Sequence, residues 1–312
     1  MQEKASEIIR EVKKAVVGKD EIISKVLMVI LAQGHILLED IPGVGKTTLA
    51  LAFSRAVSLD YKRMQFTPDV MPSDVTGFSV YNRETGALEY KPGAALCNLF
   101  LADEINRTSS KTQSALLEVM EEGKITVDGV THPTPKPYIV IATQNPVGSA
   151  GTQMLPESQL DRFMVRLTMG YPALHDEVEI LKRKQGVDPL ETVRQAANAD
   201  DLIAMQKEAD AVYLSDAVYD YIARLSAATR ENGMIRLGAS PRGSIALVKM
   251  AQATAYLCGR DYVVPGDVQY VFPDVIEHRI LLSSQAKIGG VSAGSLLKSV
   301  LKQVPAPAVT RR

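Results

Sequence analysis

The chain has 312 residues, with 35 Lys and Arg against 36 Asp and Glu, and a formal net charge of −1. This length accommodates one large domain and a smaller one, and the balanced charge predicts neither nucleic-acid binding nor an acidic tail. The cysteines Cys97 and Cys258 lie far apart, so we expect two buried thiols in a reducing interior. A charged N-terminus and the lack of a long apolar run predict a cytoplasmic protein with neither a signal peptide nor a transmembrane segment.

Two helices are predicted at the start of the chain. Apolar residues recur with helical spacing in residues 2–16, and a second, more apolar helix begins at Asp20. Residues 17–20 separate the two helices. An apolar strand follows at residues 36–38, then a loop with proline and glycine, and then a helix that runs to about residue 57.

The loop after this strand has the composition of a phosphate cradle. Its backbone N–H groups and the start of the following helix are expected to face phosphates, Lys46 to place its charge on them, and Thr47 to reach Mg²⁺. One position departs from the usual pattern, because Asp40 stands where a glycine is typical, six residues before the lysine. The residues predicted to contact nucleotide here are Asp40, Pro42, Gly43, Val44, Gly45, Lys46, Thr47 and Thr48.

The remaining elements fall into two groups. Strands are predicted at residues 61–66, 98–102, 138–142 and 163–167, a helix at 110–122, a loop with two prolines at 67–74, and β-hairpins near 77–93 and 123–137. From about residue 172 the periodicity is almost entirely helical. We therefore predict an α/β domain over residues 1–172, whose apolar strands form a parallel sheet covered on both faces, and a helical domain over 173–312.

Polar residues directly follow two of the apolar strands, where α/β sheets bind ligands. Asp103 and Glu104 end one strand, and there an acidic pair is able to hold Mg²⁺ through water and to polarise a water that attacks the γ-phosphate. Asn145 follows the next strand and is placed to orient that water. Taken alone, the acidic pair favours an ordinary solvated strand end, but its position downstream of the phosphate loop favours the nucleotide site. Asn145 alone is equally a turn residue.

Two arginines occupy positions where they can meet a nucleotide. Arg162 precedes the last strand, from where it can reach the γ-phosphate of a neighbouring subunit; the alternative is a surface arginine paired with Asp161. Arg242 lies in a helix that opens with Ser240 and Pro241, and it can fold over the phosphates from the helical domain. Its alternative is a helix-start arginine that faces solvent.

The order of these features, with the sequences around them, resembles that of the AAA+ ATPases and specifically the MoxR family. The resemblance covers nearly the whole chain. The matching sequences are LLEDIPGVGKT at 37–47, QFTPDVMPSDVTG at 65–77, FLADEINR at 100–107, ATQNP at 142–146, LPESQLDRF at 155–163 and GASPR at 238–242.

The resemblance implies a role for each candidate residue. The Walker A pair corresponds to Lys46 and Thr47, and the Walker B pair to Asp103 and Glu104. The same correspondence makes Asn145 sensor 1, Arg162 the arginine finger and Arg242 sensor 2, with Thr47 and Asp103 serving Mg²⁺.

Three further correspondences are less specific. Residues 17–19, with Val17 and Gly18 as predicted contacts, resemble the segment that lines the adenine pocket, although a plain turn between helices has the same composition. Arg107 and Arg166 are rival candidates for the arginine finger. The two hairpins resemble the helix-2 and pre-sensor-1 inserts, which in the family project toward the centre of a ring; the alternative is that both are surface decoration.

The implied function is Mg²⁺-dependent ATP hydrolysis by an oligomer, a hexameric ring in the family. The resemblance also implies chaperone-like maturation of client protein complexes with a partner that contains a von Willebrand A domain. Two alternatives stay open from the sequence. One is a magnesium-chelatase-like or DNA-remodelling motor, although no nucleic-acid partner is expected from the charge, and the other is a nucleotide-gated scaffold with little turnover.

Overall fold

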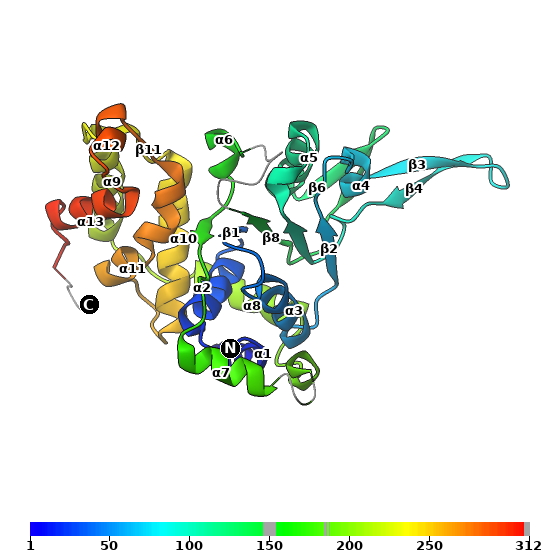
Figure 1. Ribbon diagram of the computed structural model, residues 1–312, viewed down its shortest axis with the longest axis horizontal. Helices are drawn as coiled ribbons and strands as arrows, with labels where there is room; N and C mark the ends of the chain where they lie inside the picture. Colours follow the sequence, from blue (N-terminus) through cyan, green and yellow to red (C-terminus); the bar gives the residue numbers. More distant parts are fainter. Residues whose placement is uncertain (146–153, 184–185, 187, 309–312) are drawn as a thin grey trace.

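A five-stranded sheet with the order β2-β5-β8-β1-β9 forms the centre of the computed structural model, which describes residues 1–145, 154–183, 186 and 188–308 (Figure 1). Every neighbouring pair of strands is parallel, which confirms the predicted sheet. Pro146, the last residue of one matching sequence, lies outside the described residues. The strands are β1 (Ile36–Glu39), β2 (Tyr61–Gln65), β5 (Leu99–Asp103), β8 (Ile139–Gln144) and β9 (Val165–Leu167).

Both faces of the sheet are covered, as the apolar strands predict. Successive strand residues point to opposite faces, so Ile36 and Leu38 belong to one apolar core and Leu37 to the other. The first core includes residues of α1 (Gln2–Ala15), α2 (Asp20–Leu31) and α3 (Lys46–Ala56), and the second includes residues of α5 (Ser110–Glu122). This packing fixes the ends of the strands and the loops that follow them.

Two hairpins extend from the α/β part. The first, β3 (Gly77–Asn82) with β4 (Ala87–Pro92), projects far to one side, and the second is β6 (Lys124–Val127) with β7 (Val130–Pro133) (Figure 1). The ring of Tyr90 from the first hairpin stacks on that of His132 from the second, with 3.8 Å between centroids. The two predicted hairpins are therefore present and in contact with each other.

The helical part packs directly on the sheet domain. Helix α10 (Pro241–Leu257) contacts both α2 and α8 (Ala199–Asp210), and the buried side chains of these helices belong to the same core as one face of the sheet (Figure 1). The ammonium of Lys25 in α2 lies 2.7 Å from the carboxylate of Asp274 in α11 (Pro265–Ile276). The helices of this part are α7 (Leu174–Arg183), α8 (Ala199–Asp210), α9 (Asp216–Glu231), α10 (Pro241–Leu257), α11 (Pro265–Ile276), α12 (Ser284–Ile288) and α13 (Ala293–Gln303).

Short elements complete the chain. Between the longer elements lie α4 (Pro72–Thr76), α6 (Glu157–Leu160) and the 3-10 turns η1 (Ile105–Arg107), η2 (Pro189–Thr192) and η3 (Glu277–Arg279). A small antiparallel pair, β10 (Ile235–Leu237) with β11 (Leu281–Leu282), lies within the helical part. Within the described ranges, no helix has the length and apolar character that crossing a bilayer requires.

Two local expectations are wrong, and one small element was not predicted. Cys258 is exposed, because it follows the last turn of α10, where that helix leaves the core, and only Cys97 is buried. The two-proline loop ends in helix α4, since Pro72 occupies the first helical position, where its missing N–H costs nothing. The pair β10–β11 gave no sequence signal, because its strands have only three and two residues.

Candidate nucleotide-binding site

The loop from β1 to α3 has the backbone of an anion-binding turn. Gly43 and Gly45 have φ angles of 85° and 95°, in the left-handed region that favours glycine. Gly45 is also the N-cap of α3, and no side chain caps the first amides of that helix. These N–H groups and the positive end of the helix dipole suit phosphate oxygens.

Lys46 lies along this loop. Its ammonium donates hydrogen bonds to the backbone oxygens of Asp40, at 2.8 Å, and Ile41, at 3.2 Å. Burial lowers the pKa of Lys46 from its ordinary value, and the carboxylates of Asp40, Asp103 and Glu104 oppose that shift. The backbone therefore holds the ammonium beside the loop, and three carboxylates favour its charged form.

Asp40 joins the loop to the segment that follows β9. Its Oδ2 accepts hydrogen bonds from the backbone amides of Met169, at 2.5 Å, and Gly170, at 2.7 Å, and its Oδ1 accepts one from Ile41, at 2.9 Å. The residue is only 5% exposed. The carboxylate is thus occupied by backbone amides, so the departure from the usual glycine has a structural reason that the sequence did not reveal.

The carboxyl ends of β5 and β8 bring the predicted acidic residues together. The Thr143 hydroxyl donates to Asp103 Oδ1, at 2.6 Å, and accepts from the backbone N–H of Glu104, at 2.8 Å. Glu104 has a φ of 55°, unusual for a residue with a side chain. Thr143 therefore fixes both residues of the pair, although it was not singled out from the sequence. The sequence signal for this role is a threonine near the end of a strand whose neighbour in the sheet ends in acidic residues.

The Glu104 carboxylate is held from two sides. Asn145 donates from Nδ2 to Oε1, at 3.0 Å, and Arg107 donates from Nη1 to Oε2, at 2.8 Å. The side-chain oxygen of Asn145 is buried without a hydrogen-bond partner among the described residues. A buried acceptor without a partner is costly, and a bound water or ligand at this point would satisfy it.

These groups surround one cavity of about 380 Å³. Arg63 and Gln65 of the edge strand β2 also line it, and Arg63 Nη2 lies 2.7 Å from Asp103 Oδ2. Arg63 was not predicted from the sequence, where its only signal was a position two residues before Gln65, on the same side of β2. The lining residues are Pro42, Gly43, Gly45, Lys46, Thr47, Thr48, Arg63, Gln65, Asp103, Glu104 and Asn145.

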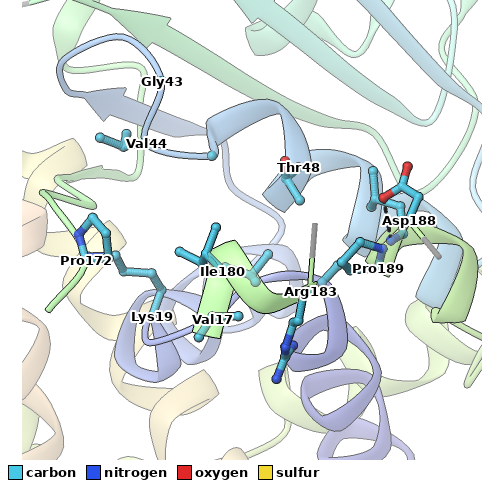
Figure 2. Close-up of a pocket in the computed structure, with 14 residues that line it drawn as sticks. Val17, Lys19, Gly43, Val44, Thr48, Pro172, Ile180, Arg183, Asp188 and Pro189 are labelled. Atoms are coloured by element: carbon cyan, nitrogen blue, oxygen red, sulfur yellow. Dashed lines mark hydrogen bonds between the residues drawn. The ribbon is translucent and has the colours of Figure 1, made fainter. Parts of the chain in front are cut away.

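A second cavity, of about 390 Å³, adjoins the loop. Figure 2 shows Val17 and Lys19 on one side, Val44 and Thr48 on the other, and Ile180 of α7 between them. The mostly apolar walls suit a flat base, as expected for the adenine pocket. Gly18 does not line it; a Cβ on Gly18 would lie 2.1 Å from the Asp176 carboxylate, so this glycine allows α7 to approach.

Arg162 and Arg242 lie away from both cavities. Both contact Glu121 of α5: Arg162 Nε is 3.1 Å from Oε2, and Arg242 Nη2 donates to Oε1. The alternative pairing of Arg162 with Asp161 is wrong, since Asp161 pairs with Arg279. The structure also does not place Arg242 over the phosphate loop of its own chain, because the first turn of α10 lies beside the end of α5, where Arg242 contacts Glu121.

The rival arginines have partners in their own chain. Arg107 binds Glu104, and Arg166 Nη1 lies 3.0 Å from the Glu39 carboxylate. Both thus contact glutamates at the strand ends, Glu104 after β5 and Glu39 in β1, whereas Arg162 contacts Glu121 of α5.

The donor set of the first cavity fits a nucleotide with Mg²⁺. The hydroxyl of Thr47 and the carboxylates of Asp103 and Glu104 are hard oxygen ligands, which Mg²⁺ prefers in combination with phosphate and water. The described residues contain no cluster of three His, Cys, Asp or Glu side chains able to hold a metal without such help. The loop amides and Lys46 supply the matching donors for phosphate oxygens.

Comparison with known proteins agrees with this geometry. Residues 35–165 match the model of the ATPase family associated with various cellular activities (AAA), and residues 227–300 match that of the AAA lid domain. The chain is 47% identical over 299 residues to the uncharacterized protein YeaC of Bacillus subtilis, an alignment that covers 96% of this chain and 93% of YeaC. It is 39% identical over 310 residues to Chaperone MoxR1 of Mycobacterium tuberculosis, an alignment that covers 96% of this chain and 82% of MoxR1.

A solved structure shows the same fold. The crystal structure of a candidate ATPase from Cytophaga hutchinsonii superposes with a TM-score of 0.91 at 38% identity, covering 98% of this chain and 96% of that one. The fold is thus the AAA+ sheet with a helical lid, and the extent and level of identity identify the subgroup. The chain belongs to the MoxR family of AAA+ ATPases.

Proposed function

We propose that this protein hydrolyses ATP with Mg²⁺ at the cavity formed by the phosphate loop and the ends of β5 and β8. The observation that carries the proposal is that Lys46, Thr47, Asp103, Glu104 and Asn145, spread over a hundred residues of sequence, line that one cavity. The neighbouring apolar cavity receives the adenine, with Val17 and Val44 in its wall.

Each residue has a distinct task in this proposal. The loop amides and Lys46 hold the phosphates, and Thr47 and Asp103 hold Mg²⁺, which supplies neutralisation of phosphate charge. Glu104 orients and polarises the attacking water, and the free oxygen of Asn145 is placed to accept a hydrogen bond from it. Positioning and electrostatic stabilisation account for most of the rate enhancement in phosphoryl transfer.

The proposal further assigns Arg162 and Arg242 to a neighbouring subunit's nucleotide. Both arginines lie outside their own nucleotide cavity and both are partly exposed, at 30% and 44%. An arginine supplied in trans stabilises transition-state charge and is worth about 10³–10⁵ in rate in other nucleotide hydrolases. The protein therefore acts as an oligomer, and the hexameric ring of the family is the assembly we propose.

Family membership is the support for a chaperone role. The 39% identical relative from Mycobacterium tuberculosis is named a chaperone. The projecting hairpin β3–β4 exposes Phe78, Tyr81 and Leu88 at 50–64%, a surface suited to contact with a client protein. We propose that this protein matures client complexes together with a partner that contains a von Willebrand A domain, and that these hairpins contact the client.

One variant tests the catalytic proposal and captures partners. Glu104→Gln keeps the shape and the contact with Asn145 but removes the base, so it is expected to bind ATP, lose turnover and stabilise the oligomer. Wild-type turnover in this variant would overturn the role of Glu104, and a wild-type protein that binds ATP without turning it over would indicate a scaffold. Co-purification with the trapped variant then identifies the client, and stimulation by DNA that falls with salt would point to a remodelling motor instead.

A further inference from the structure

The Glu121 side chain, in the last turn of α5, contacts two arginines from distant parts of the chain. Its Oε2 lies 3.1 Å from Nε of Arg162, which follows α6, and its Oε1 accepts from Nη2 of Arg242, in the first turn of α10. One carboxylate therefore joins the sheet domain, the segment before β9 and the helical lid. Nothing in the sequence pattern singles out Glu121.

Glu121 engages only part of each guanidinium. It occupies Nε of Arg162 and Nη2 of Arg242, and the other N–H donors of both arginines have no partner among the described residues. A guanidinium carries five donors in a fixed fork, so each arginine retains a set able to bind phosphate oxygens. The contact with Glu121 orients the two side chains without occupying all their donors.

The charges around Glu121 favour this arrangement. Arg162, Arg242, Lys249 and Arg279 line one cavity of about 340 Å³ with Glu121 and Asp161. Burial, together with the nearby charge of Arg242, lowers the pKa of Arg279 to about 10, while Asp161 acts in the opposite direction. Four cations thus face two carboxylates, and without Glu121 the guanidiniums of Arg162 and Arg242 would repel each other.

The backbones that carry the two arginines are also fixed to each other. Asp161 accepts from Nε of Arg279, at 2.8 Å, and from the hydroxyl of Ser240, at 2.9 Å. Ser240 is the N-cap of α10, where its hydroxyl accepts from the amide of Gly243, at 3.2 Å. The residue before Arg162 therefore holds the start of the helix that presents Arg242, which leaves the side-chain orientations to Glu121.

We propose that Glu121 is a positioning residue that holds Arg162 and Arg242 as one pair directed at the phosphates bound by a neighbouring copy of this chain. This inference rests on the proposed function, in which both arginines act in trans. It adds that the pair is assembled within one subunit before the neighbour binds, and that loss of the Glu121 charge disables the subunit that donates arginines while leaving its own nucleotide site intact.

Mixed oligomers test this directly. Subunits with Lys46→Ala lack a working nucleotide site but donate intact arginines, whereas Arg162→Ala subunits retain the site but donate only part of the pair. Mixing the two restores activity where an intact site meets an intact pair. Glu121→Gln is then added to one kind of subunit at a time, with Glu122→Gln, an exposed neighbour paired with Lys124, as the matched control.

The expected result depends on which subunit carries the change. On the Lys46→Ala subunit, Glu121→Gln is expected to lower the restored ATPase activity about a hundredfold, the scale of a small misplacement of a catalytic group. On the Arg162→Ala subunit it is expected to have no effect, and Glu122→Gln to have none in either place. A folding defect would act equally in both subunits, so this asymmetry separates positioning from stability.

Each other result overturns the inference. Equal loss in both subunits shows a structural role, and no loss in either shows that Glu121 does not position the pair. If the wild type is active but the two parent variants do not complement each other, the trans arrangement is wrong and this inference falls with it. An inactive wild type overturns the proposed function itself, so the failures are distinguishable.

Discussion

The carboxylate of Asp40, in the phosphate loop, accepts a hydrogen bond of 2.7 Å from the backbone amide of Gly170, 130 residues further along the chain. The same oxygen binds the amide of Met169, and Lys19 donates to the backbone oxygens of Met169 and Tyr171, at 2.6 and 2.9 Å. The phosphate loop and the turn between the first two helices are thus both attached to the segment that leads into the helical lid. A displacement of this segment on nucleotide binding would therefore also displace the phosphate loop.

Asp40→Gly restores the glycine that is usual at this position. The usual sequence pattern and the observed hydrogen bonds of Asp40 predict different results for this variant. The pattern predicts a tolerated change, whereas the structure predicts a loss of about 3 kcal/mol in the free energy of unfolding, because buried amides lose a charged acceptor. Weaker nucleotide binding is expected with it. Denaturant unfolding and titration with an ATP analogue measure both effects, with Asp60→Gly, an exposed aspartate, as the control. Unfolding curves that coincide for both variants would show that the hydrogen bonds of Asp40 to Met169 and Gly170 do not stabilise the protein.

Asn145→Ala is expected to lower kcat about a hundredfold, the scale found when one oriented polar group is removed from a site that stabilises developing charge. Binding of ATP is expected to change little, because Asn145 contacts Glu104 rather than the phosphate loop. Steady-state kinetics separate the two parameters. If Asn145 is only a turn residue, the variant instead loses stability and retains kcat.

Arg63→Gln is expected to lower the Mg²⁺ concentration needed for half-maximal activity several-fold. The reason is that Arg63 Nη2 lies 2.7 Å from Asp103 Oδ2, so the guanidinium and the metal compete for one carboxylate. Magnesium titration of ATPase activity at saturating ATP measures the shift, and Arg83→Gln in the turn of the projecting hairpin is the control. A higher Mg²⁺ requirement would show that Arg63 supports the site instead of competing for it.

Acid is expected to destabilise the protein through His35. This side chain is buried, donates from Nε2 to the Met120 carbonyl at 3.0 Å and accepts on Nδ1 from the Val140 amide at 3.0 Å. Burial lowers its pKa from 6.5 to about 4, so the unfolded chain binds the proton first. His35 therefore contributes stability that is complete above pH 6.5 and falls by up to about 3 kcal/mol as the pH drops to 4.

The slope of unfolding free energy against pH measures this contribution. His35→Gln is expected to flatten the slope between pH 6.5 and 4 by up to one proton, independently of any loss of packing, and His175→Gln, at an exposed histidine, is the matched control. His278 is also buried with its pKa lowered well below the ordinary value, so part of the slope remains. An identical slope in wild type and His35→Gln would contradict the assignment.

Much of the fold was accessible from the sequence because its signals are local. Helical and strand periodicity placed α1 to α3 and the apolar strands within a few residues, and the position of Asp103, Glu104 and Asn145 after strands was enough to gather them at one edge of a parallel sheet. The glycines of the phosphate loop carry their own backbone requirement, which needs no tertiary context. These features depend on neighbours within about one element of the chain.

Only the tertiary structure decided how distant elements meet. The attachment of Asp40 to Gly170, the pairing of Arg63 with Asp103, and the shared contact of Arg162 and Arg242 with Glu121 each join residues from separate elements. Such contacts depend on the packing of α10 against α2 and on the order of strands in the sheet, which no short-range pattern encodes. For this reason the sequence predicted most residues of the candidate nucleotide site, while the packing added Arg63 and Thr143 to it and decided that the two arginines lie together, away from that site.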